Sequence, residues 1–317
     1  MTGQFINSDH PSRRRALGAF GASALAASVA TSAARAATGL NLEDPWDNLT
    51  AYLKARSDIS GAVSVSWTSG YVYSHIPGQK ARVLLLGQGV KCTRCIKDER
   101  GYEFLERECV IFSDPATAEP ISTWRNPFTD RTVEVFHIRN ASAGYHIDAL
   151  GGPEDGGSAG AGGAASKGFR MNYMEHTGDV TFYDDLFYVS PSKLSLRDYA
   201  PYTAADVYEG AGIYHFHTKR ADLDNPDLSS VPVTTSHTGI RQWLPWMEMG
   251  QWAGGVVLPS RGKKLKNVGE IPRPLLTWLE KNSPEFLDAP TARDKDKQKF
   301  FYEQFREHID KKRAGEG

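Results

Sequence analysis

From residue 62 onward, the chain is dominated by alternating apolar and polar residues. Val63, Val65 and Trp67 alternate with serine and threonine, which is the period-two pattern of a half-buried β-strand. Ser69-Gly70 then predicts a tight turn into a second strand at 71–76. Similar patterns follow at 82–96, 102–112, 132–138, 169–176, 179–189, 207–218, 231–240 and 254–260. The pattern predicts about ten strands.

The order of these elements indicates a mainly β protein. Strands do not alternate with helices, so a doubly wound nucleotide-binding fold is not expected. Antiparallel sheets of this size close into barrels or split into sandwiches, because both arrangements protect the edge strands. We expect a closed, lipocalin-like or calycin-like antiparallel barrel with one deep mouth.

Helices are predicted only near the two ends of the chain. Asp44-Pro45 provides a cap and a first-turn proline for a helix over Asp44–Arg56. A charged segment over 292–312 carries Phe301, Phe305 and Ile309 at four-residue spacing, which predicts an apolar stripe. We expect this C-terminal helix to pack on the barrel, with a homodimer interface as the alternative.

The N-terminal segment has the layout of a Tat export signal. Arg13-Arg14 precedes an Ala/Gly-rich run over 16–34 and the small-residue site Ala34-Arg35-Ala36. Residues 1–36 are therefore predicted to be a removable signal, and 37–317 a periplasmic protein. A short amphipathic helix or a retained anchor is the alternative, although the run is only weakly hydrophobic.

The mature chain is predicted to be one barrel domain with an inserted loop. Residues 151–168 are almost wholly glycine, alanine and serine and are expected to form a disordered loop, since they cannot bury enough apolar surface to offset the cost of ordering. No later segment reaches the roughly 20 apolar residues of a membrane helix. We therefore expect no membrane span.

Charge and cysteine content exclude two further classes of protein. A formal charge of −1 with 24% charged residues excludes a nucleic-acid binder that works by bulk charge. Cys92, Cys95 and Cys109 are too few for a disulfide framework. A hairpin turning at residues 98–101 would place Val90 opposite Cys109, with Cys92 diagonal to it. Unpaired strand cysteines and one disulfide among them both fit this register.

Three segments resemble a known family. They are Thr123–Pro127 (TWRNP), Val133–Asn140 (VEVFHIRN) and Trp243–Gly250 (WLPWMEMG). In this order they resemble the family numbered eighteen thirty-eight among the domains of unknown function, often found behind Tat signals. The resemblance spans about residues 46–290 and implies the fold and the export signal. It implies no particular reaction.

Two histidines form a candidate metal site. His215 and His217 are two residues apart, so on a strand they share one face and could bind the same divalent ion. His137, His237 or Asp185 would have to provide the third ligand. The alternative is a pair of hydrogen-bonded structural histidines.

A second set of residues suits acid–base chemistry. His137 shares its side of a predicted strand with Arg139, which would lower the pKa of the imidazole and favour its neutral, basic form. Tyr214 and Asp185 are candidates for the assisting acid. Buried structural polar groups would explain the same residues.

Aromatic residues suggest an apolar binding slot. Trp124, Trp243 and Trp246 could line a barrel mouth, where Arg241 or Arg139 would hold an anionic group of the ligand. Core packing is the alternative for each tryptophan.

Together these features predict an exported enzyme, a lyase or isomerase that acts on a small, aromatic or otherwise apolar molecule by acid–base chemistry without an organic cofactor. The chain has no Walker loop, GxGxxG, GxSxG, HExxH or CxxCH motif. One alternative is a non-catalytic periplasmic carrier of a small hydrophobic ligand, and another is a metal-dependent enzyme built on His215 and His217. The substrate and the oligomeric state do not follow from the sequence.

Overall fold

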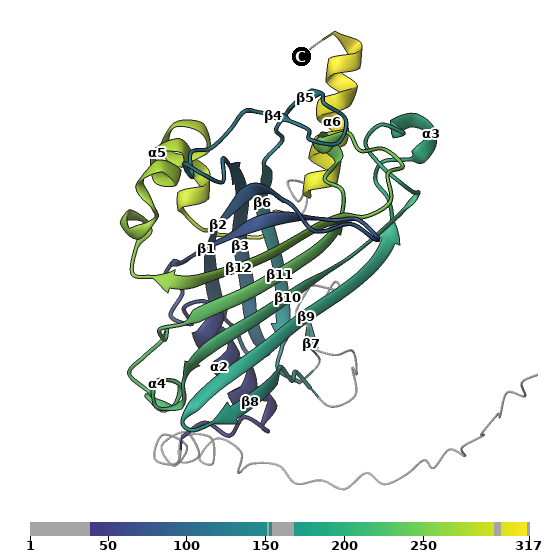
Figure 1. The fold of residues 1–317 in the computed structure, drawn as a ribbon. Coiled ribbons are helices and arrows are strands. Elements are labelled where there is room, and N and C mark those ends of the chain that lie inside the picture. The colour runs from purple at the N-terminus through teal and green to yellow at the C-terminus, as the bar shows by residue number, and fades with distance from the viewer. Residues whose placement is uncertain (1–38, 151, 154–167, 295–298, 316–317) are drawn as a thin grey trace, which may run out of the picture. The chain divides into compact units, whose positions relative to one another are not determined.

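Ten strands pair in one antiparallel sheet in the computed structural model (Figure 1). The structure describes residues 39–150, 152–153, 168–294 and 299–315. The sheet order is β7-β6-β3-β2-β1-β12-β11-β10-β9-β8. The bounds are β1 Ser64–His75, β2 Val83–Lys97, β3 Gly101–Ser113, β6 Ile138–Asp148, β7 Gly152–Pro153, β8 Asn172–His176, β9 Asp179–Pro191, β10 Val207–Lys219, β11 Thr234–Gln242 and β12 Gly255–Leu265.

This sheet confirms the mainly β, antiparallel class. The pairing is continuous from β7 at one side to β8 at the other, and closure of the sheet into a barrel stays a prediction. A separate two-stranded sheet pairs β4 (Thr123–Arg125) with β5 (Thr132–Glu134). The predicted strand at 132–138 is right only for β5, because residues 135–137 lie outside the strands, and β6 was not predicted beyond its first residue, Ile138.

The predicted hairpin at Ser69-Gly70 is wrong, because residues 64–75 form the single strand β1. Ser69 pairs with Gln88 on one side and Arg261 on the other, so β1 continues through the dipeptide. A Cβ atom on Gly70 would lie 2.0 Å from the carbonyl oxygen of Pro259. The glycine therefore permits a close approach to β12 rather than a turn.

The N-terminal helix is confirmed as α2 (Pro45–Arg56). The Asp44 carboxylate accepts hydrogen bonds from the backbone N–H groups of Trp46 and Asp47 at 3.0 and 3.1 Å, as its capping position predicts. The C-terminal helix α6 covers Phe301–Ala314, and its predicted start at residue 292 is wrong. Its stripe of Phe301, Phe305 and Ile309 is buried.

Several short elements were not predicted. They are α3 (Leu196–Tyr199), α4 (Arg220–Asp224), α5 (Arg273–Asn282) and the 3₁₀ turns η2 (Pro245–Met247), η3 (Val268–Glu270) and η4 (Pro284–Leu287). None of the helices in the described part of the chain is long and apolar enough to cross a membrane. The predicted signal at 1–36 lies outside the described residues, as do 151 and 154–167 of the predicted Gly/Ala loop.

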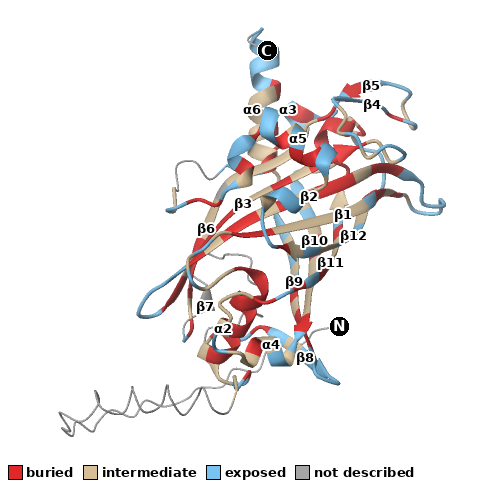
Figure 2. Ribbon diagram, turned by 90° about the vertical axis from the view of Figure 1, so that its left-hand side faces the viewer, coloured by how far each residue is buried: buried red, intermediate tan, exposed pale blue. Residues whose placement is uncertain are grey.

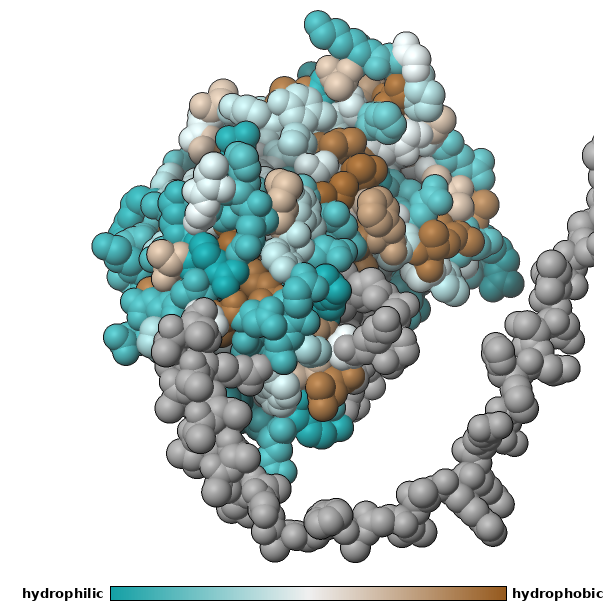
Figure 3. Space-filling view, turned by 90° about the horizontal axis from the view of Figure 1, so that it is seen from below, coloured by the Kyte–Doolittle hydropathy of each residue, from teal (hydrophilic) through white to brown (hydrophobic). Residues whose placement is uncertain are grey.

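The core forms three clusters around the sheet (Figure 2). One lies beneath α2, where Leu49, Tyr52 and Leu53 pack between residues of β2, β3 and β6 and residues of β8, β9 and β10. Another joins α6 to η2, and the third lies beneath α5. Seen from below, the molecule shows apolar side chains in separate groups among hydrophilic ones (Figure 3).

All three cysteines are buried and free. The turn at residues 98–101 forms as expected, since the Asp98 N–H donates to the Gly101 carbonyl at 3.0 Å, and Val90 pairs with Cys109. Cys92 and Cys109 belong to the cluster beneath α5, whereas Cys95 points to the cluster beneath α2. The unpaired alternative of the sequence analysis is therefore the one that the structure adopts.

Candidate functional site

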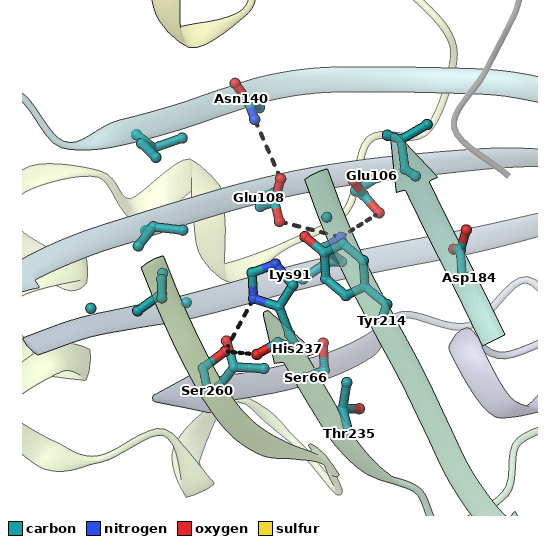
Figure 4. A pocket seen from close by; sticks show the side chains of 18 of the residues that line it. Ser66, Lys91, Glu106, Glu108, Asn140, Asp184, Tyr214, Thr235, His237 and Ser260 are labelled. Atoms are coloured by element: carbon teal, nitrogen blue, oxygen red, sulfur yellow. Dashed lines mark hydrogen bonds and ion pairs between the residues drawn. The ribbon is translucent and has the colours of Figure 1, made fainter. Parts of the chain in front are cut away.

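A cavity of about 320 Å³ lies on the concave side of the sheet. Alternate residues of β1, β2, β3, β6, β9, β10, β11 and β12 line it. Phe301 and Tyr302 of α6 lie at one end, and Ala55 and Arg56 of α2 lie at the other. Figure 4 shows that polar side chains from opposite strands meet inside it. Such a cavity, with a few convergent polar groups, is typical of a small-molecule site.

Lys91 of β2 bridges two carboxylates of β3. Its Nζ lies 3.3 Å from Oε2 of Glu106 and 3.3 Å from Oε1 of Glu108, and Asn140 Nδ2 donates to Oε2 of Glu108 at 3.3 Å (Figure 4). Burial lowers the pKa of Lys91, but the two carboxylates outweigh it and raise the pKa above its ordinary value. Burial likewise raises the pKa of Glu108, yet Lys91 and Arg241 hold it below 4.5. Both groups are therefore charged at neutral pH.

Arg56 of α2 extends this network at the floor of the cavity. Its Nη2 lies 3.3 Å from Oε2 of Glu106, and its Nη1 lies 3.1 Å from Oδ2 of Asp184 on β9. The Tyr52 hydroxyl donates to the same Asp184 oxygen at 2.6 Å. The three carboxylates of the cavity are thus paired with cations, so the floor is a fixed ionic framework.

His237 of β11 differs from these groups because one of its ring nitrogens has no partner. Ser260 Oγ lies 3.1 Å from Nδ1 of His237 and donates its own proton to the His237 carbonyl at 3.4 Å. With the Ser260 proton directed to this carbonyl, Ser260 accepts from Nδ1–H, and Nε2 then carries no proton. Nε2 is buried and has no hydrogen-bond partner among the described residues. Burial, then Arg241, lowers the pKa of His237 to about 3.

Tyr214 of β10 lies flat against this imidazole. The two ring centroids are 4.1 Å apart, with 23° between the planes. The ammonium group of Lys91 is 5.3 Å from the centre of the Tyr214 ring. Burial, followed by the charge of Glu108, raises the pKa of Tyr214 to about 12. The phenol therefore keeps its proton and can donate it.

Arg241 lies farther along β11 among tyrosines. Its Nη1 donates to the hydroxyl of Tyr188 at 2.9 Å and to that of Tyr208 at 3.1 Å, and these hydroxyls are 3.1 Å apart. The ring of Tyr302 packs on that of Tyr208 with centroids 4.4 Å apart. Burial opposes ionisation of Tyr208, but Arg241 and the Tyr188 hydroxyl lower its pKa below 10.0.

Glycines create the space between these groups. A Cβ on Gly239 would lie 3.3 Å from Cε1 of His237 and 3.7 Å from Nε of Arg241. On β10, a Cβ on Gly212 would lie 3.2 Å from the Tyr214 ring. Side chains at these two positions would therefore fill the gap between the imidazole and the guanidinium group.

The structure brings Tyr214 and Arg241 into the cavity, together with His237, which the sequence suggested only as a possible third metal ligand. His137 lies between β5 and β6, outside the cavity lining, and its Nδ1 accepts the backbone N–H of Phe112 at 3.1 Å. Burial, then Arg139, lowers the pKa of His137 to about 4, the direction expected from the sequence. Its basic lone pair is already occupied, and Arg139 contacts Ser283 Oγ at 3.4 Å.

The candidate metal ligands lie on the opposite face of β10 from Tyr214. His215 Nε2 is 3.5 Å from Oδ1 of Asp185, the predicted assisting acid, which is outside the cavity lining. His217 contacts Thr181 Oγ1 at 3.0 Å and Ser236 Oγ at 3.2 Å. Within the described residues, no group of three histidine, cysteine or carboxylate side chains is arranged to hold a metal ion.

The predicted aromatic slot is part of the core. Trp243 and Trp246 are buried in the cluster of α6 and η2, and Trp124 packs edge-on against Trp246 with centroids 5.8 Å apart. None of the three lines the main cavity. The aromatic groups that do line it are Tyr188, Tyr208, Tyr214, Phe216, Phe300, Phe301 and Tyr302.

Sequence reasoning missed His237 as a cavity residue, as well as Lys91, Glu108 and Tyr208. For Lys91 and Glu108 the expected hairpin register contained a signal, because a pairing of Val90 with Cys109 also places Lys91 opposite Glu108. The pairing of Tyr214 with His237 had no such signal, since the residues belong to strands joined by a long connection.

The family described as "Protein of unknown function (DUF1838)" matches residues 61–309. The match includes every strand that lines the cavity, and the chain belongs to this family. No curated protein matches the chain.

Proposed function

We propose that the protein is an enzyme that transfers protons on a small, aromatic or otherwise apolar molecule, as a lyase or isomerase does, without an organic cofactor. The observation that carries the proposal is the bare Nε2 of His237, buried in a cavity whose carboxylates are already paired. Nε2 would take a proton from the bound molecule, and Ser260 would hold the imidazolium through Nδ1–H.

Tyr214 is the proposed proton donor. Its phenol stacks on His237 and keeps its proton at neutral pH, with a pKa of about 12. The base and the acid thus lie side by side on neighbouring strands, with pKa values displaced in opposite directions. In a lyase step, the electron pair left by the removed proton would form a double bond while Tyr214 protonates the leaving group.

The proposal includes the closed barrel and export to the periplasm. One cavity is lined by strands from β6 through β1 to β9, so the sheet curls around it, which supports a barrel. The proposed Tat signal, residues 1–36, would place this barrel in the periplasm. A homodimer would be compatible with a closed barrel and with an open sheet.

A non-catalytic carrier is the second candidate. It is favoured by the low pKa of His237, about 3, because so weak a base removes protons only from an activated substrate. In a carrier, Nε2 would accept a hydrogen bond from the ligand without taking the proton.

Proton abstraction can be measured without knowing the product. The full chain, purified after export, would be incubated in D₂O with a panel of small aromatic acids, ketones and phenols, and deuterium incorporation or product formation followed by NMR. His237→Gln should lower turnover by about 10²–10⁴-fold while ligand binding persists. His75→Gln, on the exposed side of β1, is the matched control.

The outcomes separate the three hypotheses. Binding without exchange or product in the wild-type protein would favour the carrier. Loss of activity in His215→Gln, together with a requirement for added metal, would favour the metal-dependent enzyme. Full activity in His237→Gln would refute the proposed base.

A further inference from the structure

Among the described residues, Arg241 is a cavity cation with no carboxylate in contact and with donors left over. Arg56 and Lys91 are ion-paired, and the ammonium group of Lys264 donates to two backbone carbonyls and to Ser230 Oγ at 2.7–2.9 Å. Among the described residues, no carboxylate lies within ion-pair distance of Arg241, which nevertheless is enclosed by Tyr188, Tyr208 and Tyr214. A half-buried guanidinium group that lines a cavity and has no carboxylate in hydrogen-bond contact suits an anion as its partner.

The free edge of the Arg241 guanidinium group is complementary in shape to a carboxylate. Nη1 uses its two protons on the hydroxyls of Tyr188 and Tyr208. Within the described part of the chain, Nε and Nη2 have no hydrogen-bond partner, and Arg241 lines the cavity. The parallel Nε–H and Nη2–H bonds form the fork that binds a carboxylate through both oxygens.

Aromatic rings form part of the cavity wall beside this fork. The rings of Tyr208 and Tyr302 lie at one end, and on β10 the absence of a side chain at Gly212 leaves room beside the Tyr214 ring, which a Cβ at this position would approach to 3.2 Å. A planar ring placed over Gly212 would have its anionic end at Arg241 and its other end toward His237. The cavity volume, about 320 Å³, suits a small ligand.

We propose that the ligand of this cavity is a small aromatic monocarboxylate, whose carboxylate binds the Nε–Nη2 edge of Arg241 and whose ring lies over Gly212. The identification deepens the proposed function and rests on it for the statement that the ligand is also a substrate. Binding of the acid, however, needs only the guanidinium fork and the room at Gly212, so it can be tested separately from catalysis.

Calorimetric titration with benzoate, phenylacetate and cinnamate, each beside its neutral amide, tests the proposal. The wild-type protein should bind at least one acid about 10–100-fold more tightly than the matching amide. Arg241→Gln should remove this preference. Arg261→Gln, the same change at an exposed position of β12, should keep it. Equal binding of acids and amides, or no binding of any acid, would overturn the proposal.

Two further variants guard against a folding defect in Arg241→Gln. Arg241→Lys keeps the charge but loses the fork, so it should weaken acid binding about tenfold while its circular dichroism spectrum matches the wild type. Gly212→Val should exclude the ring while leaving Arg241 in place. Acid binding unchanged in both would refute the assigned pose. If acids bind selectively but undergo no exchange or turnover, the proposed catalysis fails and the ligand class stands.

Discussion

His137 and His237 show how one residue type takes two roles in the same molecule. Both imidazoles are neutral because burial, reinforced by a nearby arginine, lowers their pKa. His137 uses its lone pair to accept the Phe112 N–H, whereas His237 donates through Nδ1 and leaves Nε2 bare. The hydrogen-bond partner of each ring, rather than its pKa, therefore distinguishes a structural histidine from a candidate base.

These two histidines should make the protein less stable in acid. Their pKa values are about 4 and about 3 in the folded chain against 6.5 as the ordinary value, so the unfolded chain takes up protons first as the pH falls below 6.5. The free energy of unfolding should fall by about 2 kcal/mol per histidine between pH 6.5 and 4.5. Urea unfolding at several pH values measures this slope.

Glutamine variants would show whether these two histidines cause the pH dependence of the unfolding free energy. His137→Gln and His237→Gln should each flatten the pH dependence, since glutamine does not titrate, whereas His75→Gln should leave it unchanged. A wild-type slope that persists in the double variant would mean that other groups cause it.

For individual residues, the sequence predicted Tyr214 and Arg241 as site residues and missed their neighbours in the cavity, Lys91, Glu108 and Tyr208. Alternation shows which residues share a face of one strand, but it does not show which strands face each other across a cavity. His137 stands in the segment 132–138, whose pattern predicts a strand, and the sequence therefore makes it a candidate base on the same side as Arg139. The break between β5 and β6 instead places it among core residues.

Among the elements, β1 shows where turn signals mislead. Ser69-Gly70 has turn composition, yet both edges of β1 are paired, with β2 and β12. The structural requirement at Gly70 comes from β12, a strand almost two hundred residues later in the chain, so local sequence could not reveal it. The strands β2, β3, β9 and β10, whose signals were uninterrupted, agree with prediction to within two residues at each end.

Gly70→Ala should destabilise the sheet, because its Cβ would lie 2.0 Å from the Pro259 carbonyl oxygen and one backbone must move. We expect a loss of about 1–3 kcal/mol in the free energy of unfolding, measured by urea titration. Gly87→Ala is the control, since its tightest contacts would be with the two methyl groups of the Leu258 side chain, at 3.2 and 3.4 Å, and it would reach backbone only at 3.7 Å. Equal losses in the two variants would contradict the close-approach explanation.

Helix prediction succeeded where capping signals were present. Asp44-Pro45 marks the start of α2 and carries the expected hydrogen bonds. By contrast, α5 begins after Pro272 without a side-chain cap, and its buried Leu275, Leu276 and Leu279 were not recognised as an apolar face. The start of α6 was placed early because the charged residues before it have helix-forming composition without helical structure at 292–294.

For the whole molecule, α2 connects the two sides of the sheet. Arg56 and Tyr52 reach Asp184 on β9, and Arg56 also reaches Glu106 on β3. Arg56→Met would leave two buried carboxylates without this cation and should cost about 3–5 kcal/mol in unfolding free energy. Arg170→Met, which breaks an exposed pair with Glu43, should cost less than about 1 kcal/mol.

Thermal and urea unfolding of both variants would check this difference. Similar losses of unfolding free energy would show that the ion pairs of Arg56 do not hold the two sides of the sheet together. Adding Glu106→Gln and Asp184→Asn to Arg56→Met should recover part of the loss, because the two carboxylates that have lost the Arg56 cation are neutralised. The fold class followed from the strand pattern, but this ionic link did not, since its partners come from three distant segments.

The sheet order has a consequence for how the chain folds. Strands β1, β2 and β3 form one meander and β8 to β12 form another, and in the described part of the sheet the two are hydrogen-bonded to each other where β1 pairs with β12, with Val65 opposite Leu265. Each meander involves contacts that are local in the chain, whereas this seam must close a very long loop. We therefore expect this pairing to form late in folding, and the cavity, whose walls come from both meanders, to form with it.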